Sequence, residues 1–281
     1  MMDKMFSVIT VCYNAASDLP VTIESVLAQD YRDYEYIIQD KNSTDDTMRL
    51  VGSYKEKFAK KGIKFVYRRE DDTGLYDAMN KAAAAAEGEY VNFMNAGDCF
   101  YDKSVLSRAA SAAGATILYG DCAVYEYGLF HLFTKSLADI GERMPFSHQS
   151  VFAKTSFVRE HPFDLGYRYS ADYDFLLTAY DLKEKFSDIG AIVCITTADG
   201  LSSVNFHDTL SESARILEAH KRSKDSGATK YVKEIILLVK QFVMDHLPVI
   251  KKMIRIAQIR SRGRMIKADV PPWFGLRKSG Y

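Results

Sequence analysis

The sequence has few cysteines, and their spacing matches no common framework. The four cysteines, at positions 12, 99, 122 and 194, form no CxxC pair and no closely spaced set. This spacing gives neither a disulfide framework nor a zinc-ligand pattern, so we expect reduced, mostly buried thiols, as in a cytosolic protein. Asp3 and Lys4 stand directly before an apolar strand-like run, which does not match a secretory signal peptide.

Long apolar runs are absent, and so is a net charge. No segment approaches the ~20 apolar residues that a membrane-spanning helix requires. The formal charge of zero hides an asymmetry, because residues 246–281 hold nine Lys or Arg and one acidic residue, whereas residues 1–245 hold 28 and 36. Between Lys251 and Lys267 seven basic residues are interleaved with apolar ones and no acid intervenes. A helix of this composition suits an anionic membrane surface, although a solvated face or a nucleic-acid patch has the same signature.

The first 120 residues alternate apolar strand-like runs with amphipathic stretches. An apolar fraction of 47% in 281 residues is enough for a sizeable core, which excludes wholesale disorder. The alternation predicts a parallel sheet with right-handed crossovers, a Rossmann-like nucleotide-binding half. Ser17 is the expected N-cap of the first helix. We expect strands at 6–12, 34–39, 63–67 and 90–94, and helices at 17–29, 44–58 and 75–86.

The pattern changes after a short strand at 117–119. Residues 121–134 alternate as in a hairpin, and a helix at 172–184 and a strand at 189–197 are expected to follow. From Thr209 onward the pattern is helical. We therefore expect a catalytic domain over 1–206, with a nucleotide-sugar half up to about 120 and an acceptor half beyond it, and a basic helical extension over 207–281.

The most informative stretch is YVNFMNAGDCFYD, residues 90–102. An apolar run ends in a Gly-containing turn that carries a single carboxylate, Asp98. The carboxyl ends of buried strands are where open α/β sheets bind ligands, and a hard divalent cation can be held there against phosphate oxygens. Taken alone, Asp98 could equally be an ordinary turn residue.

Five ordered blocks decide between these alternatives. They read FSVITVCYN (6–14), TIESVLAQDY (22–31), YIIQDKNSTDDT (36–47), GLYDAMNK (74–81) and NAGD (95–98). Together they resemble the family 2 glycosyltransferases of bacterial polysaccharide biosynthesis over about residues 5–205. The resemblance implies an α/β GT-A fold, a Rossmann-like mixed sheet flanked by helices, here with a C-terminal helical extension. It also implies mostly inverting transfer from a nucleotide sugar, with Mg²⁺ or Mn²⁺ as the cofactor.

The same resemblance assigns residues to the donor. Asp98 matches the last carboxylate of the family's DxD metal motif, but Ala96 replaces the first acid, so Asn95 is left as a weak additional oxygen. Asp40 follows the second strand, where Ser43 and Thr44 could instead simply start a helix. The predicted nucleotide-sugar contacts are Thr10, Tyr13, Asn14, Asp40, Asp72, Asn80, Lys81, Asn95 and Asp98.

Two of these donor residues have simpler explanations. Asp72 precedes a helix, where an acidic residue complements the helix dipole. Lys81 stands four residues after Asp77 on one helix face and could form a plain ion pair. The segment 199–202 resembles a family loop that closes near the donor.

The acceptor side is assigned from two further segments. YSADYDF (169–175) resembles the family's ED motif with Ala171 in place of Glu, so Asp172 is the expected general base, a role that contributes on the order of 10²–10⁴-fold. Asp174 is given a structural or acceptor-side role, and either acid could merely stabilise the helix start. His148 and Gln149, expected at the start of a strand, resemble acceptor-cleft residues, although a lone histidine is usually satisfied by a neighbour. The other histidines, His220 included, carry no signal.

These features predict an enzyme that transfers a single sugar, since the chain has one tryptophan, Trp273, and lacks the QxxRW block of processive synthases. The first expected partner is a nucleotide-diphosphate sugar, with a UDP-sugar preferred. The others are a glycan or lipid-linked acceptor of capsule or O-antigen assembly and the inner membrane surface. No nucleic-acid partner is expected. A cytoplasmic location, peripheral at the plasma membrane, follows from this reading. The rival is a catalytically weakened scaffold subunit, which Ala96 and Ala171 make plausible. A nucleotidyltransferase is disfavoured because CYNAASD replaces a Gly-rich phosphate loop.

Overall fold

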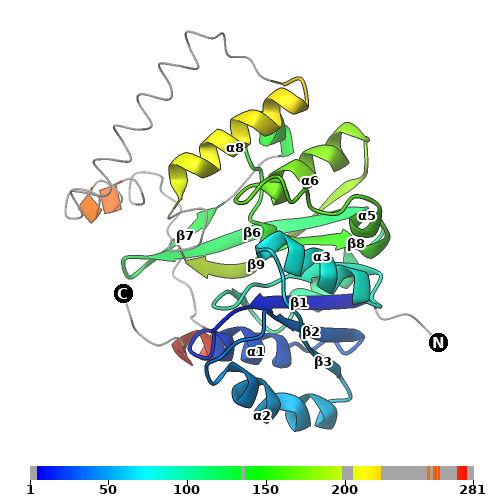
Figure 1. Cartoon of the computed structure of the whole chain (residues 1–281), viewed down its shortest axis with the longest axis vertical. Coiled ribbons are helices and arrows are strands. Elements are labelled where there is room, and N and C mark those ends of the chain that lie inside the picture. Colours follow the sequence, from blue (N-terminus) through cyan, green and yellow to red (C-terminus); the bar gives the residue numbers. More distant parts are fainter. Residues whose placement is uncertain are drawn as a thin grey trace.

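The structure is a computed structural model of the whole chain, shown in Figure 1. It describes residues 5–133, 137–197 and 205–222, together with short pieces of the tail at 252–253, 256–257, 259 and 271–276.

The N-terminal half forms the parallel part of the sheet. Its four strands are β1 (Phe6–Cys12), β2 (Tyr34–Asp40), β3 (Lys64–Arg69) and β4 (Tyr90–Phe93), paired in parallel in the order β3-β2-β1-β4. Helices α1 (Leu19–Leu27), α2 (Thr47–Lys60) and α3 (Leu75–Ala85) connect them. The predicted Rossmann-like half is confirmed.

The second half turns the sheet into a mixed one. Strand β8 (Val151–Lys154) lies antiparallel between β4 and β6 (Ile117–Glu126), and β9 (Phe186–Thr197) runs parallel to β6. Strand β5 (Cys99–Phe100) pairs antiparallel with β9, and β7 (Leu129–Phe133) forms the predicted hairpin with β6. The strand pairings join the two halves into one sheet.

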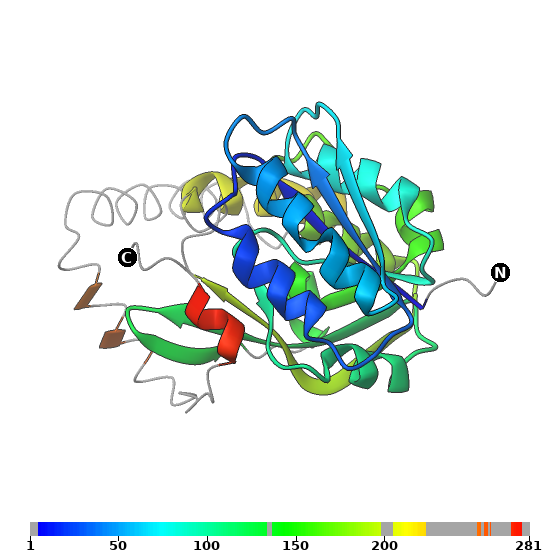
Figure 2. The same ribbon diagram turned by 90° about the horizontal axis from the view of Figure 1, so that it is seen from below.

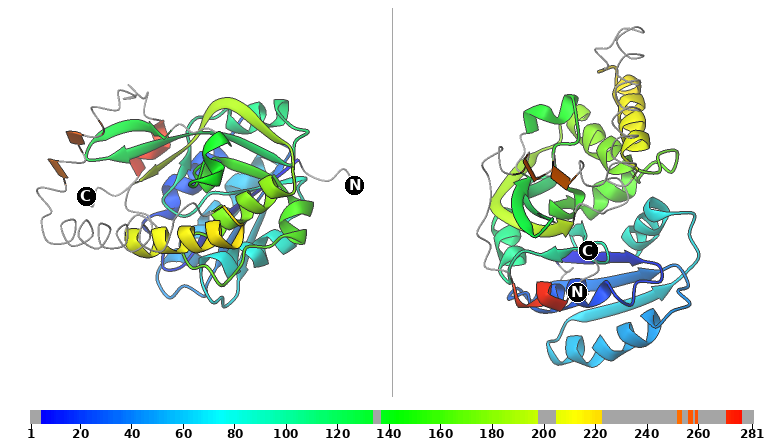
Figure 3. Two further views of the ribbon diagram at one scale, coloured as in Figure 1. Left: turned by 90° about the horizontal axis from the view of Figure 1, so that it is seen from above. Right: turned by 90° about the vertical axis from the view of Figure 1, so that its left-hand side faces the viewer.

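Helices cover both faces of this sheet. One apolar cluster packs α1, α2 and α4 (Val105–Ser111) against one face, and a second packs α3, α5 (Thr155–Glu160) and α6 (Ala171–Asp181) against the other. The right-hand view of Figure 3 shows α2 below the parallel strands and the helices of the second half above them.

Several predicted element boundaries were wrong, for local reasons. Helix α1 begins at Leu19 with Asp18 at the N-cap position, not Ser17, and Pro20 lies in its first turn, where a missing N–H is tolerated. Helix α2 begins at Thr47 because Ser43 and Thr44 are held in a loop by Asp40 and Asn14. His148 and Gln149 do not start a strand but lie in the 3₁₀ turn η2 (His148–Ser150) before β8.

The second half also departs from the expected lengths. Strand β6 continues to Glu126 instead of stopping at 119, because its far end pairs with β7 and β9. Helix α6 ends at Asp181, and Lys183 has a left-handed φ of 60° that stops it short of 184. The turn η1 (Leu137–Gly141) packs against α6.

Parts of the C-terminal region pack on the rest of the chain. Helix α8 (Phe206–Ala219) lies against α6, as Figure 1 shows. The 3₁₀ turn η3 (Pro272–Leu276) lies beside α1 and the β6–β7 hairpin, as Figure 2 shows. The ring of Phe274 packs against those of Tyr125 and Phe130. The predicted membrane-surface helix at 251–267, apart from five of its residues, and the predicted donor loop at 199–202 lie outside the described residues. None of the helices that are described has the length and hydropathy needed to cross a bilayer.

A network of buried hydrogen bonds holds the parallel strands together near their amino ends. The Ser7 hydroxyl donates to Glu35 at 2.7 Å and accepts from the Gly88 N–H at 2.8 Å, while Thr155 donates to the Gly88 carbonyl at 2.6 Å. A Cβ at Gly88 would lie 2.5 Å from backbone atoms of Phe6 and Ser7. The absence of a side chain at Gly88 is therefore a packing requirement.

We predict that Gly88→Ala lowers the free energy of unfolding by about 1–3 kcal/mol, the usual cost of overpacking. The matched control is Gly52→Ala on α2, where nothing lies within 4 Å of the added methyl group; it should raise the free energy of unfolding by about 0.5–1 kcal/mol. Urea unfolding of the three proteins measures both changes. Equal stability of the two variants would contradict this account of Gly88.

Candidate active site

The turn that carries Asp98 is held by helix α1. The Thr22 hydroxyl lies 2.6 Å from the Asp98 carbonyl oxygen and accepts a hydrogen bond from the Gly97 N–H at 3.0 Å. Gly97 has φ = 95°, a left-handed conformation that favours glycine. The Asp98 N–H closes the turn on the Asn95 carbonyl at 3.0 Å. Asp98 is thus presented by a fixed backbone at the carboxyl end of β4.

Gln149 connects η2 to this turn. Its side-chain Nε2 donates to Asp98 Oδ2 at 2.6 Å, and its side-chain Oε1 accepts from the Ser147 hydroxyl at 2.5 Å. Gln149 is buried and its contact orients Asp98, while its acceptor-side role stays a prediction.

His148 joins the Asp98 turn to the predicted base. Its Nε2 lies 2.9 Å from Asn95 Nδ2, and its Nδ1 lies 3.0 Å from Asp172 Oδ2. Asp172 Oδ1 accepts from the Tyr76 hydroxyl at 3.0 Å and from the Tyr173 N–H at 2.9 Å. In the neutral ring, a proton on Nδ1 donates to Asp172 and Nε2 accepts from Asn95; in the imidazolium both ring nitrogens donate, so the Asn95 amide must turn its Oδ1 toward Nε2.

These side chains form what we call the carboxylate cluster. Its members come from four separate parts of the chain and are joined by the contacts just described: Tyr76, Asn95, Asp98, His148, Gln149 and Asp172. Three distant sequence predictions, Asp98, His148 and Asp172, are brought into this one hydrogen-bonded set.

The electrostatics of the cluster favour a charged His148. Burial alone opposes the imidazolium, but the hydrogen bond to Asp172 and the negative charges of Asp172 and Asp98 outweigh it and raise the pKa of His148 above its ordinary 6.5. Such a cation beside two carboxylates reduces their mutual repulsion.

The cluster fits a divalent cation that takes some of its ligands from the protein and the rest from a substrate. Asn95 Oδ1 is buried and has no hydrogen-bond partner, and Asp98 lies in the same turn. A hard cation prefers such oxygen ligands, and Mg²⁺ commonly takes only one or two from the protein. Within the described residues, no group of three or more His, Cys, Asp and Glu side chains could hold a metal without other ligands. The substrate's phosphates would have to complete this site.

Asp40 lies deeper than its predicted contact with a nucleoside requires. It is fully buried, its Oδ1 accepts from both the N–H and the hydroxyl of Ser43, and its Oδ2 accepts from Tyr67 at 2.5 Å and pairs with Arg69 at 3.4 Å. Burial and the charges of Asp40 and Asp45 raise the pKa of the neighbouring Cys12 thiol to about 12. The alternative, in which Ser43 and Thr44 simply start the next helix, is wrong, because α2 begins at Thr47 and Asp40 instead holds Ser43 in the loop before it.

Three other predicted donor contacts have structural partners instead. The Thr10 hydroxyl is fully buried against Tyr36 and the Met94 carbonyl, at 2.9 and 2.7 Å. The Asn14 side chain accepts from the Thr44 N–H at 2.9 Å and so shapes a loop. Asn80 bonds both the N–H and the carbonyl of Phe163 at 2.9 Å. These three residues are not part of the carboxylate cluster.

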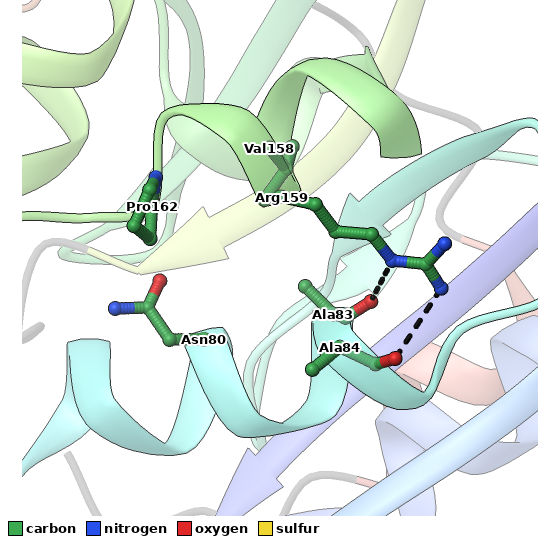
Figure 4. A pocket seen from close by; sticks show the side chains of 6 residues that line it. All are labelled: Asn80, Ala83, Ala84, Val158, Arg159 and Pro162. Atoms are coloured by element: carbon green, nitrogen blue, oxygen red, sulfur yellow. Dashed lines mark hydrogen bonds between the residues drawn. The ribbon is translucent and has the colours of Figure 1, made fainter.

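Figure 4 shows where Asn80 points. It faces a cavity of about 280 Å³ between α3 and α5, lined also by Pro162 and Arg159. The Arg159 guanidinium donates to the carbonyls at the end of α3, including those of Ala83 and Ala84 at 3.3 Å. This guanidinium satisfies helix-terminal acceptors, so the cavity is a packing feature of the helix end.

The remaining donor predictions are Tyr13 after β1, Asp72 in the loop after β3, and Lys81 on α3. Lys41 pairs with Asp72 at 3.2 Å, and Asn42 donates to Asp71 at 2.7 Å. Lys81 donates to the Asp71 carbonyl at 2.7 Å and pairs with Asp77 at 3.1 Å, the ion pair that the simpler reading expected. Tyr13, which follows β1, has an exposed ring (58%). Tyr13 is thus open to a nucleotide, whereas the Asp72 side chain is only 5% exposed beside Lys41 and Asp40 is fully buried.

Asp174 does not join the cluster. It contacts His220 Nε2 at 3.0 Å, and the other ring nitrogen of His220 lies 2.7 Å from Asp181. His220, which has no signal in the sequence, therefore connects α8 to α6. Tyr76 and Thr22 were also missed as site residues, although both lie inside the motif blocks; only their side-chain direction in the fold reveals their roles.

The comparison with protein families agrees with the fold. Residues 7–176 match the family described as glycosyl transferase family 2. The chain therefore belongs to this family and is a glycosyltransferase. A PGL/p-HBAD biosynthesis glycosyltransferase of Mycobacterium bovis is 29% identical over 185 residues, 64% of this chain and 71% of the relative. The putative teichuronic acid biosynthesis glycosyltransferase TuaG of Bacillus subtilis is 40% identical over 94 residues, which span only 34% of this chain and 36% of TuaG.

Solved structures confirm the GT-A fold. TarS of S. aureus, in complex with UDP-GlcNAc, matches with a TM-score of 0.59 at 20% identity over 75% of this chain and 66% of that one, just under two thirds of its length. The mannosyltransferase PcManGT of Pyrobaculum calidifontis, in complex with GDP-Man and Mn²⁺, matches with a TM-score of 0.61 at 16% identity over 86% and 70%. At these identities the likeness establishes the fold only.

We predict that Asp172→Asn lowers the pKa of His148 in metal-free protein, because the variant loses a charge and a charge-assisted hydrogen bond. In the wild type, protonated His148 stabilises the fold fully below about pH 6.5, and this contribution is lost as the pH rises through its higher folded pKa. NMR titration of the ring in EDTA measures the shift. Asp174→Asn, two residues along the same helix, is the control and should leave His148 unchanged; equal shifts in both variants would refute the pairing.

Proposed function

We propose that this protein is an inverting, divalent-metal-dependent glycosyltransferase. It moves one sugar from a nucleotide-diphosphate sugar to a hydroxyl of a glycan or lipid-linked glycan during surface polysaccharide assembly. The observation that carries the proposal is a connected set of hydrogen bonds. Asp98 is bound by Gln149, and the neighbouring His148 contacts both Asn95 and Asp172. A carboxylate suited to a metal and a candidate base therefore lie in one site.

The donor side of the proposal uses Asp98 and Asn95 as the protein ligands of Mg²⁺ or Mn²⁺. The cation, when bound, neutralises the negative charge that grows on the diphosphate as the glycosidic bond breaks. We place Tyr13, Asp72 and Lys81 at the nucleotide, where the Lys41–Asp72 pair connects the loops after β2 and β3. A UDP-sugar is the preferred donor, a choice that the TarS complex with UDP-GlcNAc supports by fold alone, whereas the PcManGT complex with GDP-Man and Mn²⁺ supports only the use of a metal.

The acceptor side uses Asp172 as general base. Asp172 Oδ1 already accepts two hydrogen bonds, whereas Oδ2 accepts one, from His148. Because each carboxylate oxygen offers two lone pairs, Oδ2 is the atom that takes the acceptor proton. The acceptor oxygen then bonds to the anomeric carbon on the face opposite the diphosphate, whose bond to that carbon breaks. His148 and Tyr76 hold the carboxylate for this step.

The cellular setting is proposed from the family resemblance and the basic tail. The teichuronic acid assignment of TuaG supports a surface polysaccharide, over the part that it matches. The basic residues between 251 and 267 suit the cytoplasmic face of the plasma membrane, where a lipid-linked acceptor would be found. In this proposal residues 1–206 form the catalytic domain, and 207–281 form an extension whose first helix, α8, packs on it.

The first experiment is calorimetric titration of the whole chain with UDP, GDP, dTDP and CDP, each with Mn²⁺ and with EDTA. We expect one diphosphate to bind in a metal-dependent way and Asp98→Ala to weaken its binding with Mn²⁺ at least tenfold, since a principal cation ligand is lost. Asp188→Ala, an exposed aspartate of β9, is the charge-matched control. A folded protein that binds none of the four would overturn the donor proposal and favour the scaffold.

The base assignment is tested with two neighbouring aspartates. We predict that Asp172→Asn lowers the rate of nucleoside diphosphate release from the sugar nucleotide by about 10²–10⁴-fold, the usual contribution of a general base. Asp174→Asn should keep the rate within a few-fold and instead destabilise the fold by about 1 kcal/mol or less through loss of the partly exposed His220 contact. Release assays and urea unfolding separate the two effects. The reverse ranking of rates would move the base to Asp174.

A further inference from the structure

The start of helix α6, which carries Asp172, is held by a carboxylate from another helix. Glu212 of α8 accepts three backbone hydrogen bonds, with Oε1 from the Arg168 N–H at 2.8 Å and Oε2 from the N–H groups of Tyr169 and Ser170 at 2.8 and 3.0 Å. Asp172 follows Ser170 by two residues. One side chain therefore fixes the three peptide groups that lead into the predicted base.

Other residues on the same face of α8 contact the same segment. The Ser170 hydroxyl donates to the Thr209 carbonyl at 3.2 Å, and the Arg215 guanidinium lies over the Tyr167 ring at 5.3 Å. Thr209, Glu212 and Arg215 follow at intervals of three, so they share one side of the helix. Figure 1 shows α8 alongside α6.

The segment cannot supply this support by itself. Ser170 occupies the N-cap position of α6 but its side chain makes no capping hydrogen bond, because its hydroxyl is turned to Thr209. Ser170 and Ala171 are buried, so water cannot readily replace a missing acceptor at this end of the helix. The Ser170 N–H therefore depends on Glu212, and the bonds to the more exposed N–H groups of Arg168 and Tyr169 extend the same contact.

We propose that Glu212 is a positioning residue for Asp172. It does not touch the reacting atoms but holds the backbone from which Asp172 reaches His148 and the acceptor hydroxyl. The inference rests on the proposed role of Asp172 as base. It assigns helix α8, at the start of the C-terminal region, to the working parts of the active site.

The negative charge and the length of Glu212 both matter for this role. Both carboxylate oxygens only accept hydrogen bonds, whereas a glutamine would turn an NH₂ group toward one of the backbone N–H groups. Without the carboxylate, the backbone before Asp172 relaxes, and a displacement of about 1 Å at a catalytic group can cost up to ~10²-fold in rate.

The kinetic test compares Glu212→Ala and Glu212→Gln with Glu218→Ala, an exposed glutamate on the same helix, in the full-length protein. The assay follows UDP release from UDP-glucose and UDP-GlcNAc with Mn²⁺. Glu212→Ala should lower kcat by about 10–100-fold with the donor KM within about threefold, Glu212→Gln should be intermediate, and Glu218→Ala should match the wild type. In an Asp172→Asn background, Glu212→Ala should add less than about threefold, since residues that act as a unit are not additive. Full additivity would overturn the proposal.

A second measurement needs no turnover. The ring ¹⁵N resonances of His148 report its hydrogen bond to Asp172, so Glu212→Ala and Glu212→Gln should shift them and Glu218→Ala should not. Unchanged His148 resonances in a folded Glu212 variant would mean that Glu212 supports only the loop, and the proposal would fail.

The two proposals can fail separately. If Asp172→Asn keeps wild-type turnover, the base assignment is wrong, whatever the His148 resonances show of Glu212. If Asp172→Asn is inactive but the Glu212 variants behave like Glu218→Ala, only the positioning role is lost.

Discussion

The contact between His148 and Asp172 is the interaction on which the geometry of the site depends. It joins the 3₁₀ turn η2 before β8 to the first turn of α6, two segments about 20 residues apart in the chain. Through Asn95 and the neighbouring Gln149 the same short turn also reaches the Asp98 loop. Two residues of η2 therefore set the separation of the proposed metal ligand and the proposed base. Their partly buried, charge-assisted contacts are stronger than fully exposed pairs of the same kind.

This arrangement gives a physical meaning to the two alanines that depart from the family motifs. Ala96 removes a possible carboxylate from the Asp98 turn, and the buried, unpartnered oxygen of Asn95 remains there as a neutral ligand. Ala171 removes an acid beside Asp172, and the structure places Glu212 at the same helix end from a different element. The site thus carries fewer like charges close together than a site with both acids would, and those that remain lie near the raised-pKa imidazole of His148.

The parallel half and the motif positions could be predicted from the sequence because they follow from local periodicity and strand order. Asp98 and Asp172 were located by their motifs, and the register that sets Cys12, Asp40 and Arg69 side by side follows from parallel pairing. The burial of Asp40 could not be predicted, because it depends on Tyr67 and Arg69 of the next strand closing over it. For Thr10 the deciding fact was likewise tertiary: its side chain points into the sheet core toward Tyr36. Glu212 and His220 had no local signal at all, since their partners lie about 40 residues away.

The C-terminal region also has tertiary contacts that its composition does not reveal. By composition it is a basic appendage, yet its described ends are built into the enzyme on both sides. Glu212 and His220 attach α8 to α6, while the Trp273 indole donates to the Phe100 carbonyl of β5 at 3.0 Å, two residues after Asp98. Each end of the region therefore contacts an element that directly adjoins one of the two proposed catalytic carboxylates.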